Sequence, residues 1–349
     1  WTPPSAFDAR AAWSGTFPEQ PGLALRVEAA AWRGRPIYFE VIGPWATPER
    51  GTALQRDNPM LRWTIHIIWV AVFLLGGMLT WRNWRQGRSD RRGAFRLTVF
   101  VFLAHIVTVM VGSGVIVNSL AHIYVPTSQV FIAYLGLEPY VRRRWPAVLT
   151  SWSRVLAGRF RDPLVGRDVL IGILIGITSN LIRLPFMNIS PSTFTFSLNN
   201  ETLLKVLSSA RLAAGNLVLI VGLAVAAALI YLFALFLLRL LARRDWMAVG
   251  LFALLIGVGL GAGNWQVLAM SVLANGLIAV AMTRYGLVSM VVALFALYTL
   301  SVFPVTLNFS VWYAGIGLAP LVAVLSLAVF AFYTSLGGKK VFQGSLLED

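Results

Sequence analysis

The sequence lacks several residue types on which common protein classes depend. It contains no cysteine, which excludes disulfide bonds, thiolate metal sites, cysteine nucleophiles and cysteine-ligated iron–sulfur clusters. Only 12% of its 349 residues are charged, whereas soluble domains carry about 25%. Acids are especially scarce, because 14 Asp and Glu stand against 29 Lys and Arg, for a formal net charge of +15. These shortages argue against a soluble globular domain, a disordered chain and a disulfide-stabilised scaffold.

Long apolar runs fill most of the chain after residue 62. The sequence is 58% hydrophobic, with a mean hydropathy of +0.73, and its apolar runs have the length of about 20 residues that a bilayer requires. They predict an all-α polytopic membrane protein with about nine transmembrane helices, at 63–81, 95–112, 115–137, 169–187, 212–241, 246–262, 265–282, 285–303 and 312–333. The second and third are separated by no strong polar break. One long kinked helix, or a re-entrant pair around Asn118 to Pro126, is an alternative there.

The first 62 residues have a different pattern. They contain six of the fourteen acids, and Leu23, Leu25 and Val27 alternate with polar or small residues as in a strand. Arg33-Gly34 marks a turn, and residues 37–42 form a second apolar run that ends at a Gly-Pro pair. We expect a small extracytoplasmic β-hairpin module, which leans on the membrane or on a partner because so short a segment has only a marginal core.

The distribution of basic residues predicts the topology. The loops after the first, third, fifth, seventh and ninth spans hold 19 of the 29 Lys and Arg, which predicts that these loops face the cytoplasm and that the N-terminus lies outside. The expected division is an outer module at 1–62, helices one to three at 63–137, a cytoplasmic loop at 138–168, helices four to nine at 169–336 and a cytoplasmic tail at 337–349.

The loop at 138–168 mixes arginine with aromatic residues. This pattern is typical of a helix on a membrane surface, with arginines at anionic headgroups and aromatic rings in the interface. Nucleic-acid sites use the same residue types, but a loop between two spans favours lipid, and no nucleic-acid partner is expected. The residues expected at this interface are Arg142, Arg143, Arg144, Trp145, Trp152, Arg154, Arg159 and Arg161.

No Asp or Glu lies in the middle of a predicted span. This absence argues against proton- or sodium-coupled transport, which usually needs an intramembrane carboxylate, and against an intramembrane metalloprotease. Among the polar residues within spans, His105 and His122 could be axial ligands of a haem or chlorin, although interhelical hydrogen bonding is the reading we favour, and we predict no cofactor. Arg183 could contact an anionic ligand, although extension to the headgroups is more usual.

Two further patterns lie in the apolar region. A polar cavity for an anionic or neutral solute would be built from Arg183, Asn216, Asn264 and Gln266. The glycines between Gly257 and Gly263 are spaced like those of a nucleotide loop, but no strand precedes them. We therefore read them, and the pair Gly172 and Gly176, as small residues that let helices approach closely.

Several strings resemble a known family. They are 137–146 (LEPYVRRRWP), 151–154 (SWSR), 158–168 (GRFRDPLVGRD), 38–45 (YFEVIGPW), 87–96 (GRSDRRGAFR) and 334–338 (TSLGG). Together they resemble the C-terminal membrane region of bacterial, acidobacterial-type serine/threonine protein kinases. In that family a cytoplasmic kinase domain precedes the membrane part, so an outside N-terminus would require one further span upstream of Trp1.

No kinase motif occurs in this sequence: there is no Val-Ala-Ile-Lys, His-Arg-Asp or Asp-Phe-Gly. Whether the chain belongs to an enzyme is therefore open. The leading hypothesis is a non-catalytic membrane anchor and sensor region of such a kinase, with the kinase domain or other membrane subunits as protein partners. The alternatives are a structural subunit of a larger membrane complex, with or without a pigment or haem, and a transporter or channel for an anionic or neutral solute.

Overall fold

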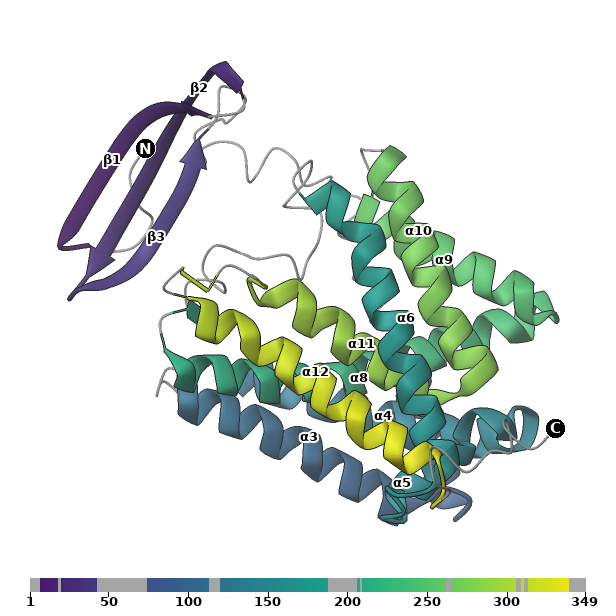
Figure 1. Cartoon of the computed structure of the whole chain (residues 1–349). Coiled ribbons are helices and arrows are strands. Elements are labelled where there is room, and N and C mark those ends of the chain that lie inside the picture. The colour runs from purple at the N-terminus through teal and green to yellow at the C-terminus, as the bar shows by residue number, and fades with distance from the viewer. Residues whose placement is uncertain are drawn as a thin grey trace, which may run out of the picture.

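The structure is a computed structural model, and it describes residues 7–17, 20–42, 74–112, 120–187, 206–207, 209–261, 265–305, 309–310 and 313–338. These residues are mostly helical, with one small antiparallel sheet near the N-terminus (Figure 1). The predicted class, a helical protein with a small β-containing N-terminal part, is therefore confirmed.

The predicted hairpin is part of a three-stranded sheet. Its strands are β1 (Ala9–Phe17), β2 (Gln20–Trp32) and β3 (Arg35–Ile42), in the order β1-β2-β3. The turn between β2 and β3 is formed by Arg33 and Gly34, whose φ angles of 51° and 74° suit a tight hairpin turn. Strand β1 was not expected, because five of its nine residues are Ala, Ser or Gly, which have little strand propensity. Pairing of Ala9–Thr16 with residues 24–31 of β2 supplies the order that local propensity does not.

Helices overlap all nine predicted segments. The helices are 74–85, α3 (Arg91–Gly112), α4 (Leu120–Arg144), α5 (Thr150–Leu156), α6 (Pro163–Met187), α8 (Ala210–Ala242), α9 (Asp245–Gly261), α10 (Trp265–Val280), α11 (Leu287–Val302) and α12 (Ala314–Ser335). A 3-10 turn, η2 (Pro146–Leu149), precedes α5, and a π-helical turn, η4 (Ala281–Tyr285), continues α10.

Five of these helices are long and apolar enough to cross a bilayer. They are Arg91–Val111, Pro163–Leu184, Ala210–Ala242, Trp265–Tyr285 and Ala314–Ser335. The predicted count of about nine is higher than length and composition support in the described part of the chain. Helices α9 and α11 have only 17 and 16 residues, fewer than the roughly 20 that a straight crossing needs. Helix α4 is longer, but it contains two prolines and ends in three arginines.

The second and third predicted spans form two separate helices, α3 and α4. They pack against each other, and they run antiparallel. The backbone N–H of Asp90, just before α3, donates to the Glu138 carboxylate near the end of α4 (3.4 Å). One continuous kinked helix is thereby excluded.

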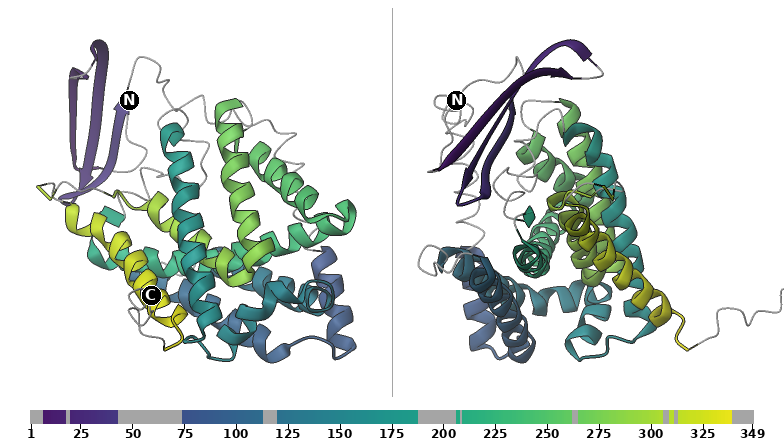
Figure 2. Two further views of the ribbon diagram at one scale, coloured as in Figure 1. Left: turned by 45° about the vertical axis from the view of Figure 1, so that its right-hand side comes forward. Right: turned by 60° about the vertical axis from the view of Figure 1, so that its left-hand side comes forward.

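Helix α6 lies in the middle of the helical part and packs on α10, α11 and α12 (Figures 1 and 2). A Cβ atom at Gly172 or Gly176 would lie 2.5 Å from the carbonyl oxygen of Ser289 or Ala293, respectively. These glycines therefore bring the backbones of α6 and α11 together, as the sequence predicted. At Gly257 of α9 a Cβ would meet Val272 of α10 at 2.5 Å, so this glycine also serves helix packing.

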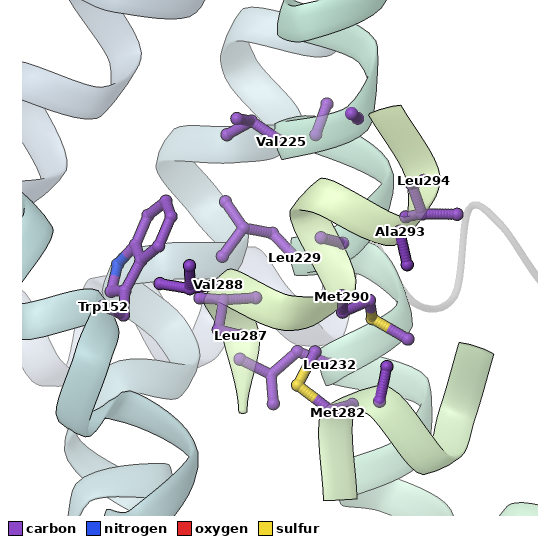
Figure 3. Packing of buried hydrophobic residues seen from close by; sticks show 14 of the residues in the cluster. Trp152, Val225, Leu229, Leu232, Met282, Leu287, Val288, Met290, Ala293 and Leu294 are labelled. Atoms are coloured by element: carbon purple, nitrogen blue, oxygen red, sulfur yellow. The ribbon is translucent and has the colours of Figure 1, made fainter. Parts of the chain in front are cut away.

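The core is continuous across the helices. Its largest fully buried side chains include Leu229 of α8 and Leu287 and Met290 of α11, which lie close together in Figure 3. The outward faces are apolar as well, with exposed large side chains such as Leu103, Leu174, Leu254 and Leu325. An exposed apolar surface on long apolar helices is consistent with membrane insertion.

Candidate functional site

The arginine-rich segment between the third and fourth predicted spans is mostly helical. Helix α4 continues to Arg144 and α6 begins at Pro163, so the connection shrinks to residues 145–162, here called the elbow. The elbow consists of η2, α5 and a turn at Gly158, whose φ is 78°. The expected loop at 138–168 was longer because hydropathy ends at the first arginines, whereas arginine is a good helix former and the helix continues.

Two of the elbow's aromatic residues lie in the protein core. Trp145 and Trp152 are 6% and 5% exposed, and Trp152 lies beside Leu287 and Val288 of α11 (Figure 3). The ring of Trp145 also faces the guanidinium of Arg239 at 4.3 Å. The expectation that both rings dip into the lipid interface is therefore wrong. Their spacing matched a surface helix, but the elbow packs its aromatic face against α8 and α11.

Acidic residues fasten the elbow to the bundle. Asp168 of α6 is 1% exposed, accepts a hydrogen bond from the Ser151 hydroxyl of α5, and pairs with Arg167 at 2.9 Å. Asp162 pairs with Arg154 and accepts the backbone N–H of Leu164 at 3.0 Å. Partial burial alone would raise the pKa of Asp162. The hydrogen bonds from Arg154 and the Leu164 amide outweigh that effect and hold the pKa of Asp162 below its usual value.

Glu138 joins α4 to the start of α3 at the same end of the bundle, through its hydrogen bond from the backbone N–H of Asp90. Glu138 is 4% exposed and pairs with Arg142 one turn later, at 2.6 Å. Asp90 caps the start of α3 by accepting the backbone N–H of Gly93 at 2.9 Å. The carboxylates at this end thus accept hydrogen bonds from groups inside the protein, whereas the arginine side chains paired with them extend to the surface.

The exposed charge at this end is consequently almost all positive. Of the neighbouring acids, Glu138 and Asp168 are buried, Asp90 and Asp162 are half-buried, and Asp245 is exposed and paired with Arg239. The exposed arginines are Arg82, Arg85, Arg88, Arg91, Arg92, Arg96, Arg142, Arg143, Arg144, Arg159, Arg161, Arg167, Arg243, Arg244 and Arg284. The surface is more basic than the composition alone implies.

The elbow also touches the break between α10 and α11. The break is made by η4 and Gly286, whose φ of 99° favours glycine. A Cβ at Gly286 would lie 2.7 Å from the carbonyl oxygen of Val148 in η2. Residues of α6, α8 and α11 and of this break therefore converge on the elbow.

The two histidines considered as cofactor ligands are placed differently. His105 is 3% exposed, its Nδ1 lies 2.8 Å from the carbonyl oxygen of Val101, and its ring packs against Gly222 of α8. His122 lies in α4, but its side chain is outside the described residues. In the described part of the chain, no group of three or more His, Asp or Glu side chains could hold a metal ion. The haem or chlorin hypothesis stays untested.

Arg183 points into the bundle. Its Nη2 donates to Oδ1 of Asn275 on α10 at 3.3 Å, and it interacts electrostatically with Tyr231 and Tyr298, which are hydrogen-bonded to each other. The more usual reading, extension toward headgroups, does not describe this contact. Side chains on a helix lean toward its N-terminus, and for Arg183 that direction leads deeper along α6.

The other residues of the predicted cavity are not shown to join Arg183. Asn216 donates to the carbonyl oxygen of Leu212 in its own helix (3.0 Å), and Gln266 is half-buried near the start of α10. Asn264 lies outside the described residues.

Two hydrogen bonds instead join polar side chains of α6 to neighbouring helices, and the cavity prediction missed both partners. The first is the bond from Arg183 to Asn275 of α10. Asn180 donates to the Ser301 hydroxyl of α11 at 2.9 Å. Both asparagines stood in the sequence as polar residues within apolar runs, which was the signal available for finding them.

The sheet carries its own ion-paired acid. Glu28 of β2 is fully buried and accepts hydrogen bonds from Arg10 of β1 (2.7 Å) and Arg26 (2.6 Å). These bonds, Arg10 first, hold the pKa of Glu28 below its usual value. The pairing fixes the register of β1 against β2.

No family model, no curated protein and no solved structure matches this chain. The geometry of the elbow and of the helices that it joins is therefore the main guide to function.

Proposed function

We propose that this chain is the membrane region of a bacterial serine/threonine protein kinase, a non-catalytic module of nine transmembrane helices. It anchors a cytoplasmic kinase domain and reports an extracytoplasmic signal to it. In this proposal the protein resides in the inner membrane, with the sheet outside and the C-terminus in the cytoplasm. The resemblance of the strings around residues 137–168 to such kinases supports this function.

The arrangement of charge supports the proposed orientation. The exposed arginines gather at the end of the bundle that carries α5, whereas the sheet lies at the other end (Figures 1 and 2). Positive loops are retained in the cytoplasm, so the elbow would face a cytoplasmic partner. The nine spans are the five long helices together with the first predicted segment, α4, α9 and α11, and a locally thinned bilayer would accommodate the short α9 and α11.

The observation that carries the proposal is the attachment of the elbow to the helices. Ser151 is bonded to Asp168 of α6, Trp152 is buried against α11, and Val148 contacts Gly286 at the α10–α11 break. A loose loop would not follow helix movements. A surface joined to several spans moves with them, which is what a module that reports across a membrane requires.

The test begins with the coding sequence upstream of Trp1 and continues with the full-length protein in cells. We expect a kinase domain upstream, and we expect the variant Ser151→Ala/Asp168→Asn to change its autophosphorylation at equal membrane abundance. Ser153→Ala is the matched control, because Ser153 is exposed on the same helix and bonds only the Leu149 carbonyl in the preceding turn. Absence of a kinase-coding sequence upstream would overturn the proposal.

A second candidate, transport of an anionic or neutral solute, is supported by the polar side chains of α6, α10 and α11. Among the described residues, the buried hydroxyls of Ser271 and Thr299 have no hydrogen-bond partner, and such groups usually bind water or a ligand. Flux of labelled solutes into vesicles that contain the purified protein would test this function. Loss of any such flux in Asn275→Leu would support it.

A further inference from the structure

The tip of the elbow has a composition unlike the rest of the segment. After α5 the chain turns at Gly158 and presents Arg159, Phe160 and Arg161, all of them exposed. Phe160 is 54% exposed, whereas Trp145 and Trp152 are buried. The elbow therefore keeps one large aromatic side chain outside the protein, with an arginine on either side.

The nearby acid is already engaged. Asp162 pairs with Arg154 and caps the start of α6 through the Leu164 amide. In the described part of the chain neither Arg159 nor Arg161 forms an ion pair with an acid. The tip is thus a local concentration of uncompensated positive charge around an apolar ring.

The tip lies level with the ends of the long helices. Pro163, two residues after the tip, packs against Gly337 just beyond the end of α12, where a Cβ would lie 3.0 Å from the proline ring. Tyr333 in the last turn of α12 is 65% exposed. Exposed aromatic residues at helix ends mark the depth of the membrane–water interface. On the other side, Arg96 of α3 donates to the Leu156 carbonyl at the end of α5 (3.2 Å).

We propose that the tip Arg159–Phe160–Arg161 is an anchor for anionic lipid, in the leaflet at this end of the bundle. Phe160 enters the boundary between headgroups and acyl chains, and Arg159 and Arg161 bind the headgroup phosphates. A ring at interface depth, flanked by two guanidinium groups that can each donate paired hydrogen bonds to phosphate, fits this partner. An acidic peptide would match the charge but would leave the ring without an apolar environment.

This anchor differs from the interface expected from the sequence. The sequence interleaves Trp145, Trp152 and Phe160 with arginines and favoured all three rings for the interface, whereas in the structure only Phe160 of the three is exposed. It is also independent of the kinase proposal, because it needs only a membrane of suitable charge.

The absence of cysteine makes the test direct. Phe160→Cys carries the only thiol of the chain, so an environment-sensitive fluorophore attached there reports on the tip alone. The full-length chain is placed in nanodiscs of phosphatidylcholine with increasing phosphatidylglycerol. We expect the emission to shift to the blue as phosphatidylglycerol increases, and the shift to weaken at high salt. Thr16→Cys, exposed on β1, is the control label and should not respond.

Charge variants give the second readout. Replacing Arg159 by Gln in the labelled protein should raise the phosphatidylglycerol fraction needed for half of the shift about fivefold, and Arg161→Gln should act likewise. The factor follows from the roughly 1 kcal/mol that a basic residue gains near an anionic surface. Arg143→Gln, an exposed arginine outside the tip, should have a smaller effect.

Two results would overturn the anchor. One is a water-like emission at Phe160→Cys in every lipid mixture. The other is a blue shift produced by a soluble polyglutamate peptide but not by phosphatidylglycerol, which would assign the tip to a protein partner.

Discussion

Buried polar side chains have different kinds of partner at the elbow end of the bundle and in its interior. At the elbow end, Asp168 and Glu138 are buried and paired with Arg167 and Arg142, whose side chains are more than half exposed. In the interior, Asn180 bonds Ser301 without any formal charge. A buried carboxylate is costly unless it is paired and hydrogen-bonded. In the described part of the chain, each of the buried acids Glu28, Glu138 and Asp168 is paired with an arginine that reaches the surface.

The same comparison explains the surface at the elbow end. Because the acids bind inward and the arginines point outward, the exposed charge there is far more positive than the residue count suggests. The pairing thus stabilises the elbow and leaves a basic surface at the same time.

The largest expected effect concerns the packing that brings the interior polar groups together. Gly176→Leu should lower the free energy of unfolding by about 3 kcal/mol or prevent folding, because its first side-chain carbon would clash with the Ala293 carbonyl. The matched control is Gly250→Leu in α9, where nothing lies within 4 Å. Thermal unfolding of the detergent-solubilised proteins, followed by gel filtration, measures both. Equal melting temperatures would refute the close contact of α6 with α11.

At the elbow end, Asp168→Ala should cost about 2–3 kcal/mol, because it leaves the buried Ser151 hydroxyl without its acceptor. Asp245→Ala serves for comparison, since that carboxylate is about half exposed and pairs with Arg239 near the surface. Its loss should cost below about 1 kcal/mol. The same unfolding assay applies. If the two variants were equally stable, the claim that the buried acids fasten the elbow would be wrong.

In the interior, the Asn180–Ser301 bond should be worth less. A double-mutant cycle with Asn180→Ala and Ser301→Ala should give a coupling energy of about 0.6 kcal/mol, which is typical of interhelical hydrogen bonds in membranes. This coupling energy can be measured by unfolding in detergent or by steric trapping, in which two bulky proteins bind tags on the unfolded chain. A coupling as large as the effect of Asp168→Ala would remove the distinction between the two regions.

The positions of the helices and the hairpin could be predicted, because both follow from patterns within short windows. Apolar runs marked every helix except the short α5, and the Arg33-Gly34 turn marked β2 and β3. The burial of Trp145 and Trp152 could not be predicted. Whether an aromatic ring on a surface-type helix meets lipid or protein depends on what packs over it, here α8 and α11, which lie far away in sequence.

The candidate sites were predicted less well for the same reason. Arg183 was identified from its position in an apolar run, but its partner Asn275 comes from a helix about ninety residues later. The pairing of Ser151 with Asp168 left no signal, since a serine and an aspartate 17 residues apart are common in any chain. Contacts between distant helices decide both.

The smallest expected effect lies in the sheet. Its buried acid, Glu28, is paired with arginines that reach the surface, as the buried acids at the elbow end are. The pKa of Glu28 in the folded protein is below its ordinary value of 4.5. Its contribution to stability is therefore fully present above that value and is lost as the pH falls through the lowered pKa. In the full chain, the protection of the β2 amides against exchange, corrected for the intrinsic pH dependence of exchange, should fall below about pH 4.5. Glu28→Gln should remove this pH dependence, and an unchanged acid response in that variant would contradict the assignment.

The most direct test of the proposed architecture is the sidedness of three single-cysteine variants, which the cysteine-free sequence allows without further changes. Thr16 lies in the sheet, Arg284 lies beside the elbow end, and Ser310 follows α11; all three are exposed. A membrane-impermeant maleimide applied to cells with a permeable outer membrane should label Thr16→Cys and Ser310→Cys. Arg284→Cys should react only after the inner membrane is opened. Labelling of Thr16→Cys and Arg284→Cys from the same side would contradict the placement of the sheet and the elbow on opposite sides of the membrane.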